Sequence, residues 1–71
     1  MRHAVHLLDV VALLRDHKEL ELIAGQVGTI VEELAPGIFE VEFSDDHGQT
    51  YATASLKAKE LITLHYNPVA A

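Results

Sequence analysis

The segment Ile38–Ser44, "IFEVEFS", constrains the fold more than any other part of the chain. Its apolar and acidic positions alternate, with Phe39, Val41 and Phe43 set against Glu40 and Glu42. Because successive side chains of a strand point to opposite faces, this pattern predicts a strand with one buried and one solvated face. Turn signals stand on both sides, Ala35-Pro36-Gly37 before the segment and Asp45–Gly48 after it. The pattern therefore predicts a sheet built from hairpins.

Four more segments have the composition of strands: Leu7–Leu14, Val27–Leu34, Thr50–Ala54 and Leu61–His65. The first, "LLDVVALL", is apolar on both faces apart from one aspartate, which is typical of a buried strand. A polar stretch, Arg15–Gln26, predicts a long loop with room for one helical turn. Lys57–Glu60 predicts a single helical or 3₁₀ turn, with Ser55 as its cap.

Five short strands, a long first loop, two tight hairpins and a helical turn before the last strand are the element order of an SH3-like barrel. We therefore expect an all-β, five-stranded SH3-like barrel as a single domain over residues 1–71, with a core over about 7–65 and a tail at 66–71. With 71 residues and no cysteine, the chain is near the size limit for one unassisted core and has no disulfide. Hydrophobic residues make up 49%, which excludes a disordered chain.

The charge is strongly acidic, with 11 Asp and Glu against 5 Lys and Arg and a net charge of −6. Because phosphate contacts dominate nucleic-acid affinity, this balance makes nucleic acid an unlikely partner and favours a basic protein. The apolar run Val10–Leu14 is far shorter than the ~20 residues that cross a bilayer. The N-terminus superficially resembles a signal peptide, but Asp9 interrupts its apolar run, and we predict a cytoplasmic protein with no membrane partner.

The stretch "AGQVGTIVEE", Ala24–Glu33, raises the question of a phosphate loop. Its glycines match neither dinucleotide-binding nor P-loop spacing, and a strand follows them where a phosphate site needs a helix. Gly25 is better explained by a turn into the strand, and Gly28 by a bulge or a close backbone approach. A KOW-like RNA-binding element has a similar glycine, but it needs basic and aromatic groups on the outer face.

Three long strings carry a family resemblance: "LLDVVALL", "LIAGQVGTIVEEL" and "FEVEFSDDHGQTYATASLKAKEL". Together they resemble the small bacterial proteins of domain-of-unknown-function family 4926, over about Leu7 to Leu64. The resemblance implies a small SH3-like or KOW-like β fold of unassigned biochemical role, without recognised catalytic residues. It also suggests a partner encoded nearby.

The turn Ala35-Pro36-Gly37 suggests a register for the first hairpin. If the turn pairs Leu34 with Ile38, then Glu32 lies opposite Glu40 and Ile30 opposite Glu42. In this register Thr29 and Val31 point into the barrel.

Glu32, Glu40 and Glu42 would then share the outer face of the sheet. Like charges directly opposite one another destabilise a strand pair. Three explanations stay open: a solvated acidic face, a docking face for a basic protein, and a divalent-cation site. Calcium requires six or more converging ligands, which a twisted sheet rarely supplies, so we predict no metal here.

The second hairpin contains Asp45 and Asp46 close to Gly48. The calcium-loop pattern is not satisfied, and turn chemistry explains these residues. SH3-type barrels commonly make contacts through the long first loop and the second hairpin, here Asp16–Leu22 and Asp45–Gly48. We therefore add Asp45 and Asp46 to the three glutamates as candidate partner-binding residues.

Five histidines are many for this length: His3, His6, His17, His47 and His65. The first two could approach the last in a barrel and bind zinc or nickel, but no fixed spacing supports a site, and scattered surface histidines are the preferred interpretation. No nucleophile motif surrounds Ser44 or Ser55, and a barrel this small has no room for an enclosed pocket.

We therefore expect a non-enzymatic protein-interaction module without a cofactor, which binds a basic partner through its acidic face. Two alternatives stay open. One is a KOW-like nucleic-acid-associated module. The other is a structural homo-oligomer that buries apolar surface from the N-terminal segment or the "LHYNPVAA" tail, where Tyr66 and Val69 have no evident core role.

Overall fold

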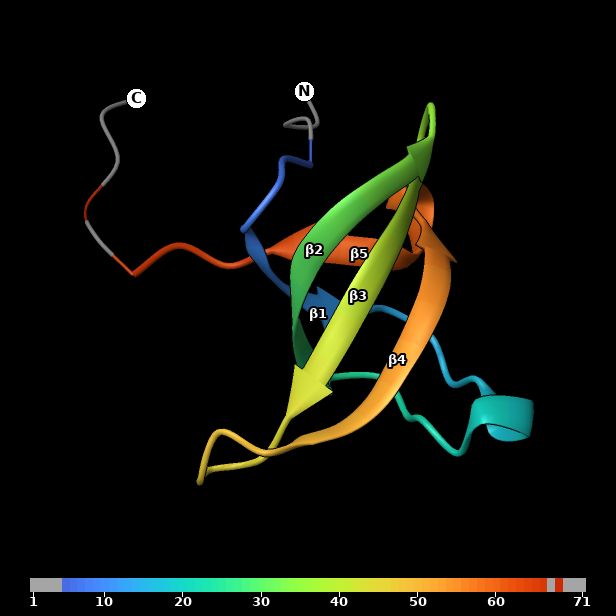
Figure 1. Ribbon diagram of the computed structural model, residues 1–71, viewed down its shortest axis with the longest axis vertical. Helices are drawn as coiled ribbons and strands as arrows, with labels where there is room; N and C mark the ends of the chain where they lie inside the picture. Colours follow the sequence, from blue (N-terminus) through green and yellow to red (C-terminus); the bar gives the residue numbers. More distant parts are fainter. Residues whose placement is uncertain (1–4, 67, 69–71) are drawn as a thin grey trace.

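Five antiparallel strands form one sheet in the computed structural model, which describes residues 5–66 and 68 (Figure 1). The strands are β1 (Val10–Leu13), β2 (Val27–Ala35), β3 (Ile38–Ser44), β4 (Thr50–Lys57) and β5 (Leu61–Thr63). Two 3₁₀ turns accompany them, η1 (Lys18–Leu20) and η2 (Ala58–Glu60). The sheet order β4-β3-β2-β1-β5 is that of an SH3-like barrel, which confirms the predicted fold class.

The last strand of the chain lies beside the first strand in the sheet. β5 pairs with β1, while η2 makes the short connection from β4 (Figure 1). Two backbone hydrogen bonds hold η2 in place: Ala58 N–H donates to the Gly37 carbonyl at 3.0 Å, and Leu14 N–H donates to the Glu60 carbonyl at 2.9 Å. Within the described residues no helix is long and apolar enough to cross a bilayer, and the cytoplasmic location stays a prediction.

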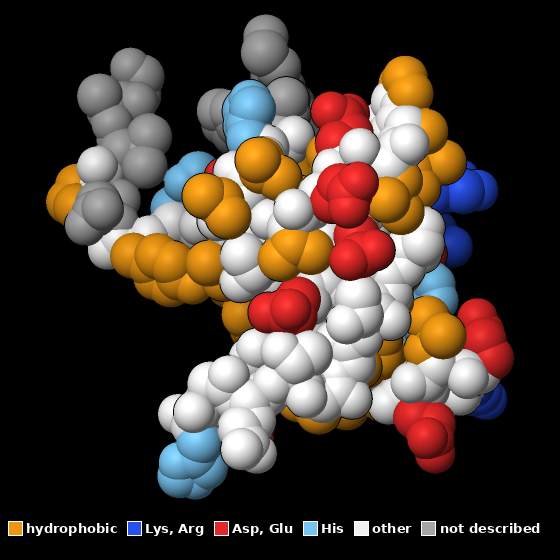
Figure 2. All heavy atoms as spheres, in the orientation of Figure 1, with side chains coloured by type: hydrophobic (Ala, Val, Ile, Leu, Met, Phe, Trp, Pro, Cys, Tyr) orange, Lys and Arg blue, Asp and Glu red, His pale blue; other side chains and the backbone are white. Residues whose placement is uncertain are grey.

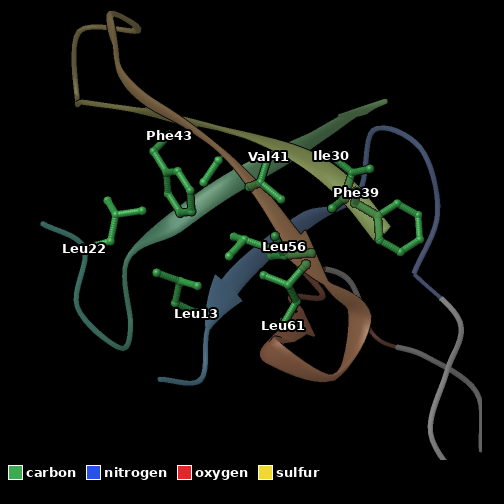
Figure 3. Packing of buried hydrophobic residues seen from close by; sticks show 10 residues of the cluster. Leu13, Leu22, Ile30, Phe39, Val41, Phe43, Leu56 and Leu61 are labelled. Atoms are coloured by element: carbon green, nitrogen blue, oxygen red, sulfur yellow. The ribbon is translucent and has the colours of Figure 1, made fainter. Parts of the chain in front are cut away.

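The core lies between the inner faces of the coiled sheet (Figure 3). Its buried members are Val11, Leu13, Leu22, Ile30, Phe39, Val41, Phe43, Ala54, Leu56 and Leu61. The alternation predicted for Ile38–Ser44 is confirmed, since every second residue of β3 is buried. One core residue is not on a strand: Leu22 of the long first loop is only 2% exposed. Burial of such a side chain contributes about 1.5–3 kcal/mol.

The first strand is shorter than predicted. Leu7, Leu8 and Leu14 are 59%, 70% and 51% exposed, so β1 keeps only the centre of the apolar run. A turn precedes it, in which His6 N–H donates to the Asp9 carboxylate at 2.8 Å. Leu8 takes a left-handed φ of 71°, and its N–H donates to the Ile30 carbonyl at 2.8 Å. Asp9 therefore ends the turn where an unbroken apolar strand was expected.

The boundaries of β4 and β5 also differ from those predicted. β4 runs on to Lys57, so Ser55 lies inside the strand opposite Glu40 and does not cap the 3₁₀ turn. The cap is supplied by Glu60, whose carboxylate accepts the Lys57 N–H at 2.8 Å. β5 ends at Thr63, two residues before the predicted end.

Two register shifts in β2, one beside the first turn and one at a bulge further along the strand, change the predicted pairing. Ala35 pairs with Ile38, where Leu34 was expected, and the register shifts again between Ile30 and Glu32. The pair of Glu32 and Glu40 is confirmed. Beyond the bulge the prediction is wrong, because a single extra residue in one strand reverses which side chains face inward.

The extra residue of that bulge is Val31. Ile30 therefore pairs with Val41 and is fully buried, while Thr29 and Val31, predicted to point inward, are half-buried. Thr29 pairs with Glu42 and shares its outward face.

Gly28 and Gly37 occupy positions where a larger residue would be strained. Pro36 and Gly37 form the tight first hairpin, where proline fixes φ and Gly37 takes a φ of +76°. A Cβ on Gly28 would lie 2.6 Å from Val41 Cγ1, so this position needs glycine for close packing against β3. The predicted close approach at Gly28 is confirmed. Gly25 and Gly48, at φ of +93° and +79°, serve the other two predicted turns.

Candidate interaction face

The three glutamates that the sequence placed together do share the outer face of the sheet. Glu32 lies directly opposite Glu40 across β2 and β3, and Glu42 is two residues further along β3. Glu32 is exposed, and the other two are half-buried by their neighbours. We call these three residues the acidic stripe. Figure 2 shows acidic side chains along this part of the molecule.

The acidic stripe has no cation paired with it among the described residues. Among the described residues, the carboxylates within salt-bridge distance of a basic side chain all face histidines. His6 lies near Asp9, and His17 lies near both Glu19 and Glu60. On the far side of the stripe, β4 sets Ser55 opposite Glu40 and Thr53 opposite Glu42. Lys and Arg side chains visible in Figure 2 lie at the margin of the molecule, away from the stripe. Glu32 and Glu40 therefore stand directly opposite one another without an ion-pair partner, while Lys57 has the same outward parity on β4, two residues along from Ser55.

An apolar area continues the same outer face toward the other edge of the sheet. Ala12 of β1 pairs with Val27 of β2 and with Ile62 of β5. All three occupy the strand positions that face outward, between the buried ones. Val27 and Ile62 are 43% and 50% exposed, although such residues usually occupy a core. The segments of β1 and β5 are almost wholly apolar, so no alternation marked these residues as outward-facing, and a first strand buried on both faces was predicted.

Asp45 and Asp46 occupy a different place from the acidic stripe. They lie in the hairpin between β3 and β4, which projects on the opposite side of the molecule from the η1 loop (Figure 1). The Asp45 carboxylate accepts the N–H groups of His47 at 2.8 Å and Gln49 at 3.0 Å, so it organises the turn. The structure therefore does not bring the first loop, the hairpin and the stripe together into one contact surface.

A histidine–carboxylate cluster joins the first loop to η2. His17 Nε2 lies 2.7 Å from Glu60 Oε2, and its Nδ1 lies 3.6 Å from Glu19 Oε1. The contact with Glu60 is short but is not aligned as a hydrogen bond, and it becomes an ion pair when the imidazole is protonated. Burial raises the pKa of Glu60, but the Lys57 N–H and the nearby His17 lower it more, so the pKa lies below its ordinary 4.5.

Sequence reasoning did not find this cluster. It treated all the histidines as scattered surface residues, yet the His17 side chain is only 17% exposed. Neither residue belongs to a motif, and the contact depends on the path of a long loop, so nothing in the local sequence could have predicted it.

The histidines do not assemble into a metal site in the part of the chain that the structure describes. In that part, no group of three or more His, Cys, Asp or Glu residues could hold a metal ion. His6 contacts Asp9 at 3.7 Å. The suggested approach of His3 to His65 involves a residue that lies outside the described ranges.

Comparison with known proteins gives a family and no activity. No curated protein and no solved structure matches this chain. A family model described as a domain of unknown function (DUF4926) matches residues 7–63 of the 71, and the chain therefore belongs to this family, as its sequence strings suggested.

Proposed function

We propose that this protein is a small non-enzymatic interaction module that binds a basic protein partner through the acidic stripe. The observation that carries this proposal is the pair of Glu32 and Glu40, directly opposed and without a paired cation among the described residues. A partner that supplies Lys or Arg side chains would remove this repulsion and add charge-assisted hydrogen bonds. The same charges would accelerate diffusional encounter with a basic surface.

The proposal keeps three of the five candidate partner-binding residues. Asp45 is committed to its turn, and Asp46 lies on the far hairpin, so the partner contacts are assigned to Glu32, Glu40 and Glu42. A partner encoded nearby, suggested by the sequence resemblance, stays a prediction. Nucleic acid is a poor candidate for this face, because phosphates would meet carboxylates.

The test compares two variants with matched charge. In E40K/E42K both substitutions lie on the acidic stripe, and in E21K/D46K both lie on exposed residues away from it. Tagged wild-type chain and each variant serve as bait in a lysate of the native host, after circular dichroism has shown that all three fold. The expected partner is a basic protein retained by wild type and E21K/D46K and lost by E40K/E42K.

Kinetics of the isolated partner then give the decisive measurement. E40K/E42K should bind more slowly than E21K/D46K at low salt, with a weaker dependence of the association rate on salt. Equal affinity and equal salt dependence in the two variants would contradict the proposal.

A further inference from the structure

The strand register aligns the outward side chains in a row that crosses the whole sheet. Val10 of β1 pairs with Thr29 of β2, Thr29 with Glu42 of β3, and Glu42 with Thr53 of β4. On the other side of β1, Leu64 N–H donates to the Val10 carbonyl at 2.9 Å, which brings Leu64 to the end of the same row. The row therefore changes from apolar to acidic, with Thr29 at the boundary.

The apolar part of this row belongs to a larger area. We define the apolar half of the outer face as Val10, Ala12, Val27, Ile62 and Leu64, on three adjacent strands or their continuation. Figure 2 shows hydrophobic side chains beside the acidic ones, toward the part of the molecule where β5 leads into residues 64–66. Val27 and Ile62 are exposed and the other three are half-buried, and apolar side chains gathered at a surface beside polar ones are typical of an interaction site.

This face favours a helix over an extended segment as the part of a partner that binds to it. The face presents side chains, while the backbone groups of β1 and β2 are engaged in the sheet. An extended segment lying flat on it would bury its own N–H and C=O groups without partners. A helix satisfies these groups internally and offers an apolar stripe along one side.

We propose that the partner docks an amphipathic α-helix on this face, with its apolar stripe over the apolar half and Lys or Arg along one border over the acidic stripe. This inference rests on the proposed function, and it specifies which surface of the basic partner is recognised. Neighbouring strands are about 4.8 Å apart, so β1 and β3 are separated by about 10 Å. A helix of about 10–12 Å diameter covers both at once. Charge complementarity requires the cations along only one border, because the acidic stripe lies on only one side of the apolar half.

The test uses a defined peptide of about 18 residues, long enough to span about 27 Å as a helix. Its leucines form one stripe, and its lysines lie along one border of that stripe. A second peptide of the same composition carries the lysines opposite the leucines. Binding to the full chain is measured by isothermal titration at low salt and at about 1 M NaCl.

Three variants separate the two halves of the face. V27T/I62T removes apolar area while keeping β-branched residues on the strands, and E40K/E42K reverses the acidic stripe. L20T/I23T is the matched control, because Leu20 and Ile23 are also exposed, at 42% and 62%, but lie in the first loop. Loss of about three methyl or methylene groups, one at Val27 and two at Ile62, is expected to weaken the first peptide about tenfold or more in V27T/I62T.

The expected pattern is that V27T/I62T weakens the first peptide at both salt concentrations, E40K/E42K weakens it only at low salt, and L20T/I23T leaves it unchanged. The second peptide should bind wild type more weakly than the first. Weakening by E40K/E42K alone would overturn the helix inference and leave the proposed function standing. No binding of the first peptide, or equal binding of both peptides, would also overturn the inference, while the lysate experiment still tests the function. Self-association of the wild-type chain that V27T/I62T abolishes would assign the face to a second copy and overturn it.

Discussion

Reversal of one charge in the acidic stripe should stabilise the free protein. Glu40 lies directly opposite Glu32, with Ser55 on its other side and no paired cation among the described residues. In Glu40→Lys the repulsion across β2 and β3 becomes an attraction. Directly opposed residues have Cβ atoms about 4.5–5.5 Å apart, and favourable or unfavourable charge pairs there contribute about 0.2–1 kcal/mol each.

The two effects add, because a repulsion is lost and an attraction is gained. We expect the free energy of unfolding to rise by about 0.5–1.5 kcal/mol at low salt. For a domain of this size that corresponds to a melting temperature about 2–12 °C higher. Because exposed charges are screened, most of the gain should disappear in about 1 M NaCl.

Thermal unfolding followed by circular dichroism measures this directly. Asp46→Lys is the control, because it makes the same change in net charge on an exposed residue of the β3–β4 hairpin. The control separates the specific pair from a general reduction of the −6 charge. A Glu40→Lys protein that melts at or below wild type at low salt would refute the reasoning, as would a gain that survives high salt.

Three further predictions concern the fold. Gly28→Ala should lower the free energy of unfolding by about 1–3 kcal/mol, because its Cβ would lie 2.6 Å from Val41 Cγ1; a urea midpoint equal to that of wild type would contradict this. Leu22→Ala should cost about 2–5 kcal/mol in urea unfolding, because this loop residue is 2% exposed in the core, whereas a loss below about 1 kcal/mol would mean that the loop is not anchored there. Glu60 has a lowered pKa, so the stability from its charged form is complete above its ordinary 4.5 and is lost as pH falls through the lowered pKa. Glu60→Gln should therefore flatten the acid side of a melting-temperature profile, and an unchanged acid slope would contradict the stabilisation of the Glu60 carboxylate by the Lys57 N–H and His17.

The fold was predictable because its main signals are local. Alternation in Ile38–Ser44 and turn residues at both of its ends define two hairpins without any tertiary information. The bulge at Val31 was not predictable, because no glycine or other local signal marks the extra residue. Leu22 was missed for a related reason, since only the packing of the first loop on the sheet shows that this leucine is buried.

The candidate site was predicted in part. The pair of Glu32 and Glu40 was predicted correctly although the turn pairs Ala35, and not Leu34, with Ile38, because a register shift between Glu33 and Ala35 restores the predicted pairing before the bulge at Val31. The apolar half could not be predicted, because the excess of apolar residues around Val10 indicated a strand buried on both faces. In the structure only its inward residues, Val11 and Leu13, are buried.

The proposed function requires that the acidic stripe determines which partner is bound. Its most direct test is the dissociation constant of the lysine-bordered peptide for E40K/E42K compared with E21K/D46K at low salt. Binding should be about tenfold or more weaker in E40K/E42K than in E21K/D46K. Equal dissociation constants for the two variants would contradict it.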